Sequence, residues 1–366
     1  MFIIPPHIQK LQPYKPGKPD ANIFGDNKPE REVVLSSNEN NFGPSPLAME
    51  AYVANADKIF LYPDPVSGQL KQALSAMLNL KPENLSVGNG SDSLLYNIMR
   101  GFFGPGQTLL TSAGAFVSAK KYAAMSNIPI VETPMIGNYE FDLQTILDHI
   151  DDSTQVIYIV NPNNPTGTMI STTALADFVA RVPEHIIIVI DEAYCEFSRV
   201  LSPEYPDATQ LGRDNIIVLR TFSKAYGMAG LRLGYAIGAP VLISTLNKVK
   251  LTFDPNNAAQ AAGVAALDDI AFLEKTIENN RHELPRLYHC YDELGIKYVP
   301  GFGNFVMLDL GTEVAVEDLY EQLKNRGVLT RRLASFGIPQ ALRVTVGTPE
   351  DNDYLMAQLR SVYLAK

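Results

Sequence analysis

Three apolar stretches, each followed at once by polar residues, decide the fold of this chain: Val156-Ile-Tyr-Ile-Val160 before Asn161-Pro-Asn-Asn-Pro-Thr-Gly167, Ile186-Ile-Ile-Val-Ile190 before Asp191-Glu-Ala-Tyr194, and Ile216-Ile-Val-Leu219 before Arg220-Thr-Phe-Ser-Lys224. Short β-branched runs separated by helical patterns are typical of buried parallel strands. Ligands of open parallel sheets bind beyond the carboxyl ends of the strands. We therefore expect Asn164, Asp191, Tyr194 and Lys224 to meet at one edge of a sheet.

The same alternation of helices and strands extends to both sides of these stretches. Further strands of this sheet are expected at residues 108–110, 128–132 and 233–237, and helices at 52–59, 68–80, 91–103, 242–251, 258–267 and 270–294. The remainder changes character, with strands expected at 305–310 and 342–346 and helices at 316–326 and 350–364. The predicted fold class is α/β, with a large, mostly parallel sheet domain and a small α+β domain.

The length of 366 residues exceeds what one ordinary hydrophobic core organises, so two domains are expected. The first thirty-odd residues are rich in Pro, Gly and Lys and have the character of an extended arm. We predict an arm at residues 1–42 that packs partly on the small domain, a large domain at 43–270, and a small C-terminal domain at 271–366.

Composition and charge narrow the functional classes. With 46% hydrophobic and 19% charged residues the chain is typical of a globular protein, and its net charge of −10 argues against a nucleic-acid or anionic-membrane partner. Cys195 and Cys290 have neither a disulfide pattern nor metal-ligand spacing, so we predict reduced packing residues and no metal. The start lacks a signal-peptide pattern, and the longest aliphatic run, 186–190, is far shorter than a membrane span. A cytoplasmic protein is expected.

The four polar residues at the strand ends match what pyridoxal 5′-phosphate (PLP) requires of a protein: a lysine for its aldehyde, a carboxylate for its pyridine nitrogen and donors for its phenolic oxygen. Burial behind a strand lowers the pKa of a lysine such as Lys224. Asp191, which ends an apolar strand, needs a cationic or hydrogen-bond-donating partner, and a protonated pyridine nitrogen is one. Taken singly, these residues fit a surface lysine, a helix cap or salt bridge, a packed tyrosine and a turn asparagine. Their convergence favours PLP.

A phosphate site is expected at Gly88-Asn-Gly-Ser-Asp92, which directly precedes a predicted helix. The free N–H groups and the dipole at a helix start favour an anion. Ser223 and Arg232 add a hydroxyl and a guanidinium that binds phosphate through two hydrogen bonds. A glycine-rich helix entry is weak evidence alone, and Arg232 alone fits an ordinary surface residue.

Several motifs then occur in a familiar order: residues 37–40 (Ser-Asn-Glu-Asn), Tyr62-Pro-Asp, the glycine-rich and Asn-Pro motifs above, Asp191-Glu-Ala-Tyr, Thr221-Phe-Ser-Lys-Ala-Tyr-Gly, Gly230-Leu-Arg-Leu-Gly-Tyr and Leu342-Arg-Val-Thr-Val-Gly-Thr. The chain resembles the fold-type I aminotransferases, class I and II, and within them the histidinol-phosphate aminotransferase branch. The likeness covers nearly the whole chain and implies that fold.

The resemblance implies a role for each matching position around the cofactor. Lys224 would form the Schiff base with PLP and move the proton between the substrate Cα and the cofactor carbon. Asp191 would pair with the pyridine nitrogen, and Tyr194 and Asn164 would contact the phenolic oxygen. At the phosphate the contacts would be Ser91, Asp92 (through its backbone), Ser223 and Arg232. Phe116 would stack on the ring. Tyr62 would reach the cofactor phosphate of a neighbouring subunit, which implies a homodimer.

For the substrate, the resemblance implies that Arg343 holds an α-carboxylate by a two-point contact, which suits a guanidinium. Tyr14 and Arg331 match positions that bind the phosphate of histidinol phosphate, and Asn164 also faces the substrate. Two departures stand out: Arg332, where the branch often has another residue, and Ala119, where the family usually has a tyrosine three residues after the stacking aromatic.

The predicted function is ping-pong transamination between histidinol phosphate and 2-oxoglutarate on PLP bound to Lys224, a step of histidine biosynthesis. The loss of polarity at Ala119 keeps open an aromatic amino-acid aminotransferase. A decarboxylase of amino-acid phosphates on the same scaffold is a further alternative. A non-catalytic PLP-binding regulator would need a DNA-binding module, for which the chain has no spare basic segment. A purely structural α/β protein would leave the polar residues at three strand ends as coincidence.

Overall fold

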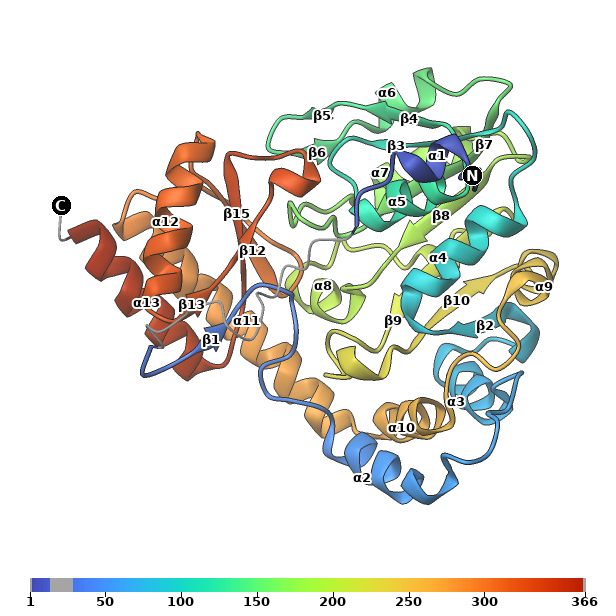
Figure 1. Cartoon of the computed structure of the whole chain (residues 1–366), viewed down its shortest axis with the longest axis horizontal. Coiled ribbons are helices and arrows are strands. Elements are labelled where there is room, and N and C mark those ends of the chain that lie inside the picture. Colours follow the sequence, from blue (N-terminus) through green and yellow to red (C-terminus); the bar gives the residue numbers. More distant parts are fainter. Residues whose placement is uncertain (1, 14–28, 365–366) are drawn as a thin grey trace.

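The computed structural model describes residues 2–13 and 29–364. Figure 1 shows two layered units, a larger one built on a seven-stranded sheet and a smaller one built on a four-stranded sheet. Helix α11 (Ile270–Glu293) runs from the larger unit to the smaller one (Figure 1). This arrangement agrees with the predicted α/β fold class.

The large sheet has the strand order β2-β10-β9-β8-β7-β3-β4. Neighbouring strands from β4 to β9 are parallel, whereas β10 is antiparallel to both β2 and β9. The predicted strand at 233–237 therefore belongs to this sheet but runs against its neighbours, and the sequence interpretation missed β2. The bounds are β2 (Leu85–Gly88), β3 (Thr108–Ser112), β4 (Ile130–Thr133), β7 (Thr154–Val160), β8 (Ile187–Asp191), β9 (Ile216–Thr221) and β10 (Gly234–Gly238).

The central strands form because they are apolar on both faces and are covered by helices. All residues of β8 and β9 are buried. The helices of this unit are α2 (Pro46–Ala54), α3 (Gly68–Leu78), α4 (Gly90–Gly101), α5 (Val117–Met125), α6 (Leu143–Asp148), α7 (Thr172–Arg181), α8 (Cys195–Leu201), α9 (Pro240–Val249) and α10 (Asn257–Asp268).

Side-chain caps set several helix starts, because a polar oxygen there accepts a hydrogen bond from an otherwise unpaired backbone N–H. The oxygen of Ser45 accepts from Ala48 N before α2, and that of Asp269 accepts from Phe272 N before α11. The same pattern occurs at Asp142, Ser171, Asn256 and Thr312. Short 3-10 turns lie at Ala56–Lys58, Pro82–Asn84, Ala208–Gln210, Ala229–Leu231 and Ala334–Phe336.

The smaller unit has an antiparallel sheet in the order β11-β12-β15-β14. Its elements are β11 (Tyr298–Val299), β12 (Phe305–Asp309), β14 (Arg331–Arg332), β15 (Ala341–Thr345), α12 (Glu313–Asn325) and α13 (Pro349–Leu364). Its core packs Leu287, Val306, Leu342 and Leu359 against one another. In the register of the sheet, Arg331 of β14 lies opposite Arg343 of β15, which places two cations side by side.

The N-terminal segment contacts both units. Helix α1 (Pro6–Gln9) lies beside α5 of the large unit, and β1 (Val33–Val34) pairs in parallel with β13 (Val328–Leu329) next to the small one (Figure 1). A hairpin of β5 (Met135–Ile136) and β6 (Glu140–Phe141) reaches the small unit through Tyr139, whose hydroxyl donates to Asp309 at 2.9 Å. The domain limits at 42 and 270 stay a prediction. Within the described ranges, every helix is too short or too polar to cross a bilayer.

Candidate active site

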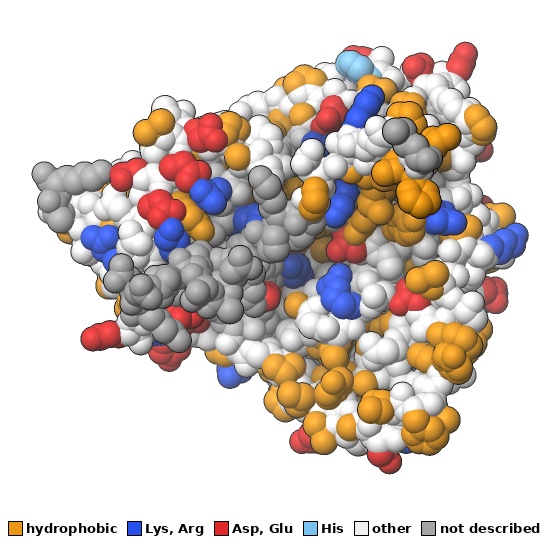
Figure 2. Space-filling model, in the orientation of Figure 1, with side chains coloured by type: hydrophobic (Ala, Val, Ile, Leu, Met, Phe, Trp, Pro, Cys, Tyr) orange, Lys and Arg blue, Asp and Glu red, His pale blue; other side chains and the backbone are white. Residues whose placement is uncertain are grey.

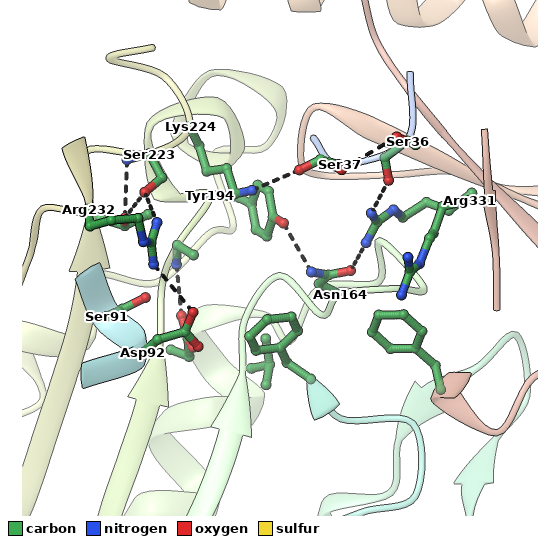
Figure 3. A pocket seen from close by; sticks show the side chains of 17 residues that line it. Ser36, Ser37, Ser91, Asp92, Asn164, Tyr194, Ser223, Lys224, Arg232 and Arg331 are labelled. Atoms are coloured by element: carbon green, nitrogen blue, oxygen red, sulfur yellow. Dashed lines mark hydrogen bonds and ion pairs between the residues drawn. The ribbon is translucent and has the colours of Figure 1, made fainter. Parts of the chain in front are cut away.

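A pocket opens beyond the carboxyl ends of β7, β8 and β9, between the two sheets. Its volume is about 840 Å³, including space that is open to solvent, which is in the size range of cofactor and substrate sites. Figure 3 shows its side chains converging from the large sheet and from the 36–37 segment. It is lined by Ser36, Ser37, Ser91, Asp92, Phe116, Val160, Asn164, Asp191, Ala193, Tyr194, Thr221, Ser223, Lys224, Arg232, Arg331, Phe336 and Arg343.

Lys224 enters the pocket from the turn after β9. Its Nζ donates a hydrogen bond of 3.1 Å to the backbone oxygen of Ser37 (Figure 3). Burial, together with the positive charges of Arg343 and Arg232, lowers the pKa of this amine to about 8. A lysine with a lowered pKa is neutral, and hence nucleophilic toward an aldehyde, over a larger part of the neutral range than a surface lysine.

Asp191 ends β8 and is buried at the floor of the pocket. Its Oδ2 accepts a hydrogen bond of 2.8 Å from the hydroxyl of Tyr158, and its Oδ1 accepts one of 3.2 Å from the N–H of Ala193. Burial nevertheless raises the pKa of the carboxyl to about 6. A cation placed beside Asp191 would restore its ionised form, which is the situation of a carboxylate that faces a protonated pyridine.

Tyr194 and Asn164 lie side by side above this floor (Figure 3). The Nδ2 of Asn164 donates to the hydroxyl of Tyr194 at 3.1 Å, and the Oδ1 of Asn164 accepts from Nη1 of Arg343. Burial raises the pKa of Tyr194 to about 12, so its phenol stays protonated at neutral pH. The three side chains form one continuous polar wall.

The opposite end of the pocket presents hydrogen-bond donors and a positive charge. Helix α4 begins at Gly90, and Gly90 has φ +79, the left-handed region in which glycine is at ease. A Cβ at this position would lie 2.5 Å from Nη2 of Arg232, and a Cβ at Gly234 would lie 2.5 Å from the backbone N of Ser91. Because Gly90 and Gly234 lack a Cβ, the guanidinium of Arg232 and the backbone N–H of Ser91 can both lie at the start of α4.

Arg232 supplies the positive charge beside the start of α4, and we call this group of donors (Ser91, Ser223 and Arg232) the phosphate cradle. Arg232 pairs with the carboxylate of Asp92 at 3.4 Å and donates to the hydroxyl of Ser223 at 3.3 Å (Figure 3). A helix start, a guanidinium and a hydroxyl together match the donors that phosphate prefers.

The wall formed by the small unit carries Arg331, Arg343 and Phe336. The two guanidinium carbons lie 5.8 Å and 6.0 Å from the ring centre of Phe336. Nη2 of Arg343 also donates to the backbone oxygen of Ser36 at 2.8 Å. Arg332 points elsewhere, since it pairs with Glu317 at 2.5 Å and lies over the ring of Tyr320 at 4.2 Å.

The structure brings most of the predicted site residues into this pocket. Tyr62 is the exception: it is 79% exposed and stacks on Phe253 at 4.3 Å, away from the pocket. Tyr14 lies outside the described residues. Several residues that shape the site had no role in the sequence interpretation. They include Ser36 and Ser37, which contribute backbone oxygens, Tyr158, which lies within an apolar run, and Phe336, which ends a short 3-10 turn.

The pocket fits PLP. Lys224 supplies an amine of lowered pKa, and Asp191 supplies a buried carboxyl whose raised pKa favours a cationic partner. The hydroxyl of Tyr194 and the amide of Asn164 line the same pocket, and Arg232 lies beside the start of α4 at its other end. These are the contacts that an aldehyde, a pyridine nitrogen, a phenolic oxygen and a phosphate require.

Fold and site together define an aminotransferase. Residues 30–359 match the family of class I and II aminotransferases, and the chain belongs to this family. The predicted fold type and the predicted class of enzyme, a PLP-dependent aminotransferase, are thereby confirmed.

The chain is similar over its whole length to histidinol-phosphate aminotransferases. It is 40% identical to the one of Anaeromyxobacter, with 98% of each chain covered, and 38% identical to that of Moorella thermoacetica, with 97% and 92% covered. Among solved structures, the histidinol-phosphate aminotransferase of Sinorhizobium meliloti in complex with pyridoxal-5′-phosphate has a TM-score of 0.89 at 27% identity, with 99% and 98% covered. An aspartate aminotransferase of Thermus thermophilus, at 22% identity, shares the fold, with a TM-score of 0.83 and 99% and 100% covered.

Proposed function

We propose that this chain is a histidinol-phosphate aminotransferase, which transfers the amino group of histidinol phosphate to 2-oxoglutarate in two half-reactions and acts in histidine biosynthesis. The products are imidazole-acetol phosphate and glutamate. PLP would be held by Lys224, Asp191, Tyr194, Asn164 and the phosphate cradle around Arg232.

The observation that carries the substrate proposal is the pairing of Arg331 with Arg343 on neighbouring strands. Like charges opposite each other on a sheet repel. In the described part of the chain, no acidic side chain forms an ion pair with Arg331. A substrate phosphate between the two guanidinium groups would remove the repulsion. A carboxylate on Arg343 alone suits 2-oxoglutarate and glutamate.

The chain's own residues then have separable tasks. PLP, when bound, supplies an electron sink that stabilises negative charge at the substrate Cα. Asp191 would keep a proton on the ring nitrogen of bound PLP, and Tyr158 holds the carboxylate in place through its 2.8 Å hydrogen bond. The Lys224 amine would take the proton from Cα and return it, and a pKa lowered to about 8 suits both directions. Phe116 lines the pocket and would pack against the ring of bound PLP.

A homodimer is part of this proposal. Exposed hydrophobic side chains gather on the larger unit, with Ile59 82%, Phe60 80% and Leu251 77% exposed; the others are Leu61, Tyr62, Val66 and Phe253. Figure 2 shows hydrophobic side chains gathered around α2 and the segment that follows it. Contiguous apolar surface of this kind marks a protein interface. Burying it against a second copy would give Tyr62 its implied place at the neighbour's cofactor phosphate. We place this enzyme in the cytoplasm.

A half-reaction panel tests the substrate assignment. PLP-loaded protein is mixed with histidinol phosphate, histidinol, phenylalanine, tyrosine or glutamate, and the loss of visible absorbance is followed. Histidinol phosphate is expected to exceed histidinol in kcat/KM by about 100-fold, since removing a phosphate that forms charge-assisted hydrogen bonds costs this order of rate, and to react faster than the aromatic amino acids. Faster reaction with phenylalanine or tyrosine would favour the aromatic aminotransferase instead.

The structure gives that alternative no added support. Ala119 is fully buried in α5 and lies outside the pocket lining, so its small side chain does not enlarge the substrate site. Carbon dioxide release from a phosphorylated α-amino acid added to the panel would instead indicate the decarboxylase.

The dimer has its own test. Phe60→Asp and Leu251→Asp are expected to halve the mass measured by light scattering, because each would bury a charge in an apolar interface. Val314→Asp is the matched control, since Val314 is 80% exposed on α12 of the smaller unit. A mass that is unchanged in all three variants would contradict this assignment of the surface.

A further inference from the structure

Asn38 is a buried residue with an unusual backbone. Its φ of 55° lies in the left-handed region, and its side chain is fully shielded from solvent. Asparagine tolerates this region better than most residues, but such a conformation persists only where the surroundings hold it. Asn38 lies between the two units, since its backbone N contacts Thr345 of β15 and its side chain contacts Tyr194 of the large unit.

Thr345 determines which way the Asn38 amide faces. The N–H of Asn38 donates to Oγ1 of Thr345 at 3.0 Å, and the same hydroxyl donates to Oδ1 of Asn38 at 3.1 Å. The single proton of the Thr345 hydroxyl is thus directed at the amide oxygen of Asn38. The oxygen of the amide therefore faces Thr345, and the Nδ2 group faces Tyr194.

Tyr194 receives hydrogen bonds from two amides. Nδ2 of Asn38 donates to its hydroxyl oxygen at 2.9 Å, and Nδ2 of Asn164 donates at 3.1 Å. The Asn164 amide is oriented in turn by Arg343, which donates to its Oδ1. A phenolic oxygen has two acceptor positions, and both are then filled. The Tyr194 proton has to be donated, and the pocket that Tyr194 lines is the side left for it.

We propose that Asn38 is a positioning residue that makes Tyr194 a hydrogen-bond donor toward the phenolic oxygen of PLP. This inference rests on the proposed function, because it needs PLP on Lys224. A donor at that oxygen stabilises its negative charge and favours the deprotonated form of the cofactor bound to lysine. Asn38 would therefore lower the pH at which the visible absorbance of the bound cofactor changes.

Asn38→Gly is the main test. Glycine keeps the left-handed backbone and the N–H bond to Thr345, and it removes only the amide. The midpoint of the absorbance change is expected to rise by about half to one pH unit, the size of one neutral hydrogen bond. Asn38→Asp, of equal size, puts an acceptor where the donor was and is expected to raise the midpoint further. Asn127→Gly is the matched control, because Asn127 has φ 56° and is exposed on the turn after α5.

A second mutation separates positioning from general packing. In a Tyr194→Phe background, Asn38→Gly is expected to leave the midpoint where Tyr194→Phe alone puts it, because Asn38 acts through that hydroxyl. Equal shifts in both backgrounds would overturn the proposal. Thr345→Val keeps Asn38 but removes the hydroxyl that orients its amide. We expect this variant to raise the pH midpoint by less than Asn38→Gly does, and it replaces Asn38→Gly as the test if that variant folds poorly.

The dissociation constant of PLP provides a second readout, measured by fluorescence titration of the PLP-free protein. Asn38→Gly is expected to weaken PLP binding by about five-fold, again through Tyr194 only. A wild-type midpoint and a wild-type affinity in Asn38→Gly would refute the role of Asn38 and leave the proposed function intact. A wild-type protein without Lys224-dependent visible absorbance would instead refute the proposed function.

Discussion

The hydroxyl of Tyr158 donates a 2.8 Å hydrogen bond to Oδ2 of Asp191, and both side chains are buried beneath the pocket. Even with this bond, burial raises the pKa of Asp191 to about 6. The folded protein therefore holds this proton more tightly than the unfolded chain, where the pKa is near 3.8. Its contribution to stability is full below pH 3.8 and is lost as the pH rises through about 6.

Asp191→Asn is thus expected to stabilise the PLP-free protein above pH 6, by about 3 kcal/mol at most, while abolishing turnover. Urea unfolding of the PLP-free wild type and variant at pH 5 and pH 8 measures this. The stability difference should grow with pH. A difference that is equal at both pH values would show that the carboxyl is not held at a raised pKa.

The pKa of Lys224 sets the pH dependence of PLP capture. A neutral amine attacks the aldehyde, and with a pKa of about 8 the association rate is expected to rise with pH and level off above 8. At pH 7 the neutral fraction is about 300 times that of a lysine at 10.5. Stopped-flow absorbance on the PLP-free protein tests this. A rate that still climbs beyond pH 10 would contradict the lowered pKa.

Three arginines give a matched set of substitutions at the substrate wall. Arg343→Ala is expected to raise KM for glutamate and 2-oxoglutarate by about 10- to 100-fold, because charge-assisted hydrogen bonds are lost. Arg331→Ala should act mainly on histidinol phosphate. The guanidinium of Arg332 pairs with Glu317 outside the pocket, so Arg332→Ala should leave KM unchanged for glutamate, 2-oxoglutarate and histidinol phosphate. Steady-state kinetics with each substrate separates the three, and equal effects of Arg331 and Arg332 would remove the assigned role of Arg331.

Two glycines with similar backbones test the phosphate cradle. Both glycines have a positive φ, +79° at Gly90 and +82° at Gly106. The Cβ of Gly90→Ala would lie 2.5 Å from Nη2 of Arg232, whereas that of Gly106→Ala would meet no atom within 4 Å. Both are expected to lose about 1 kcal/mol of stability from backbone strain. Only Gly90→Ala should also weaken PLP binding, by about 10-fold or more, as measured by titration. Equal PLP affinity in the two variants would argue against the cradle.

The sequence predicted the parallel centre of the large sheet well, because strands that are buried on both faces are recognisable as unbroken apolar runs. Those runs also located Asn164, Asp191 and Lys224, since each lies in the polar segment, at most five residues on, that follows one of them. The edge strand β2 was not predicted because Leu85-Ser-Val-Gly88 is short and contains Ser and Gly. The antiparallel direction of β10 was not predicted because it depends on chain connections that periodicity does not encode.

The residues that the sequence interpretation left without a role act through contacts rather than through motifs. Tyr158 counted as one more apolar strand residue, and only the register of β7 beside β8 shows that its hydroxyl reaches Asp191. Asn38 lay inside a quoted motif, yet its role depends on Thr345, which is 307 residues away in the chain. Contacts between units of this kind are set by tertiary packing.

The assignment of Lys224 as the lysine that binds PLP can be tested by reducing the PLP-loaded protein with borohydride and mapping the modified peptide by mass spectrometry. Modification at Lys224, and its loss in Lys224→Ala, is the predicted result. Modification of another lysine in the wild type, with Lys224 unmodified, would contradict the site described above.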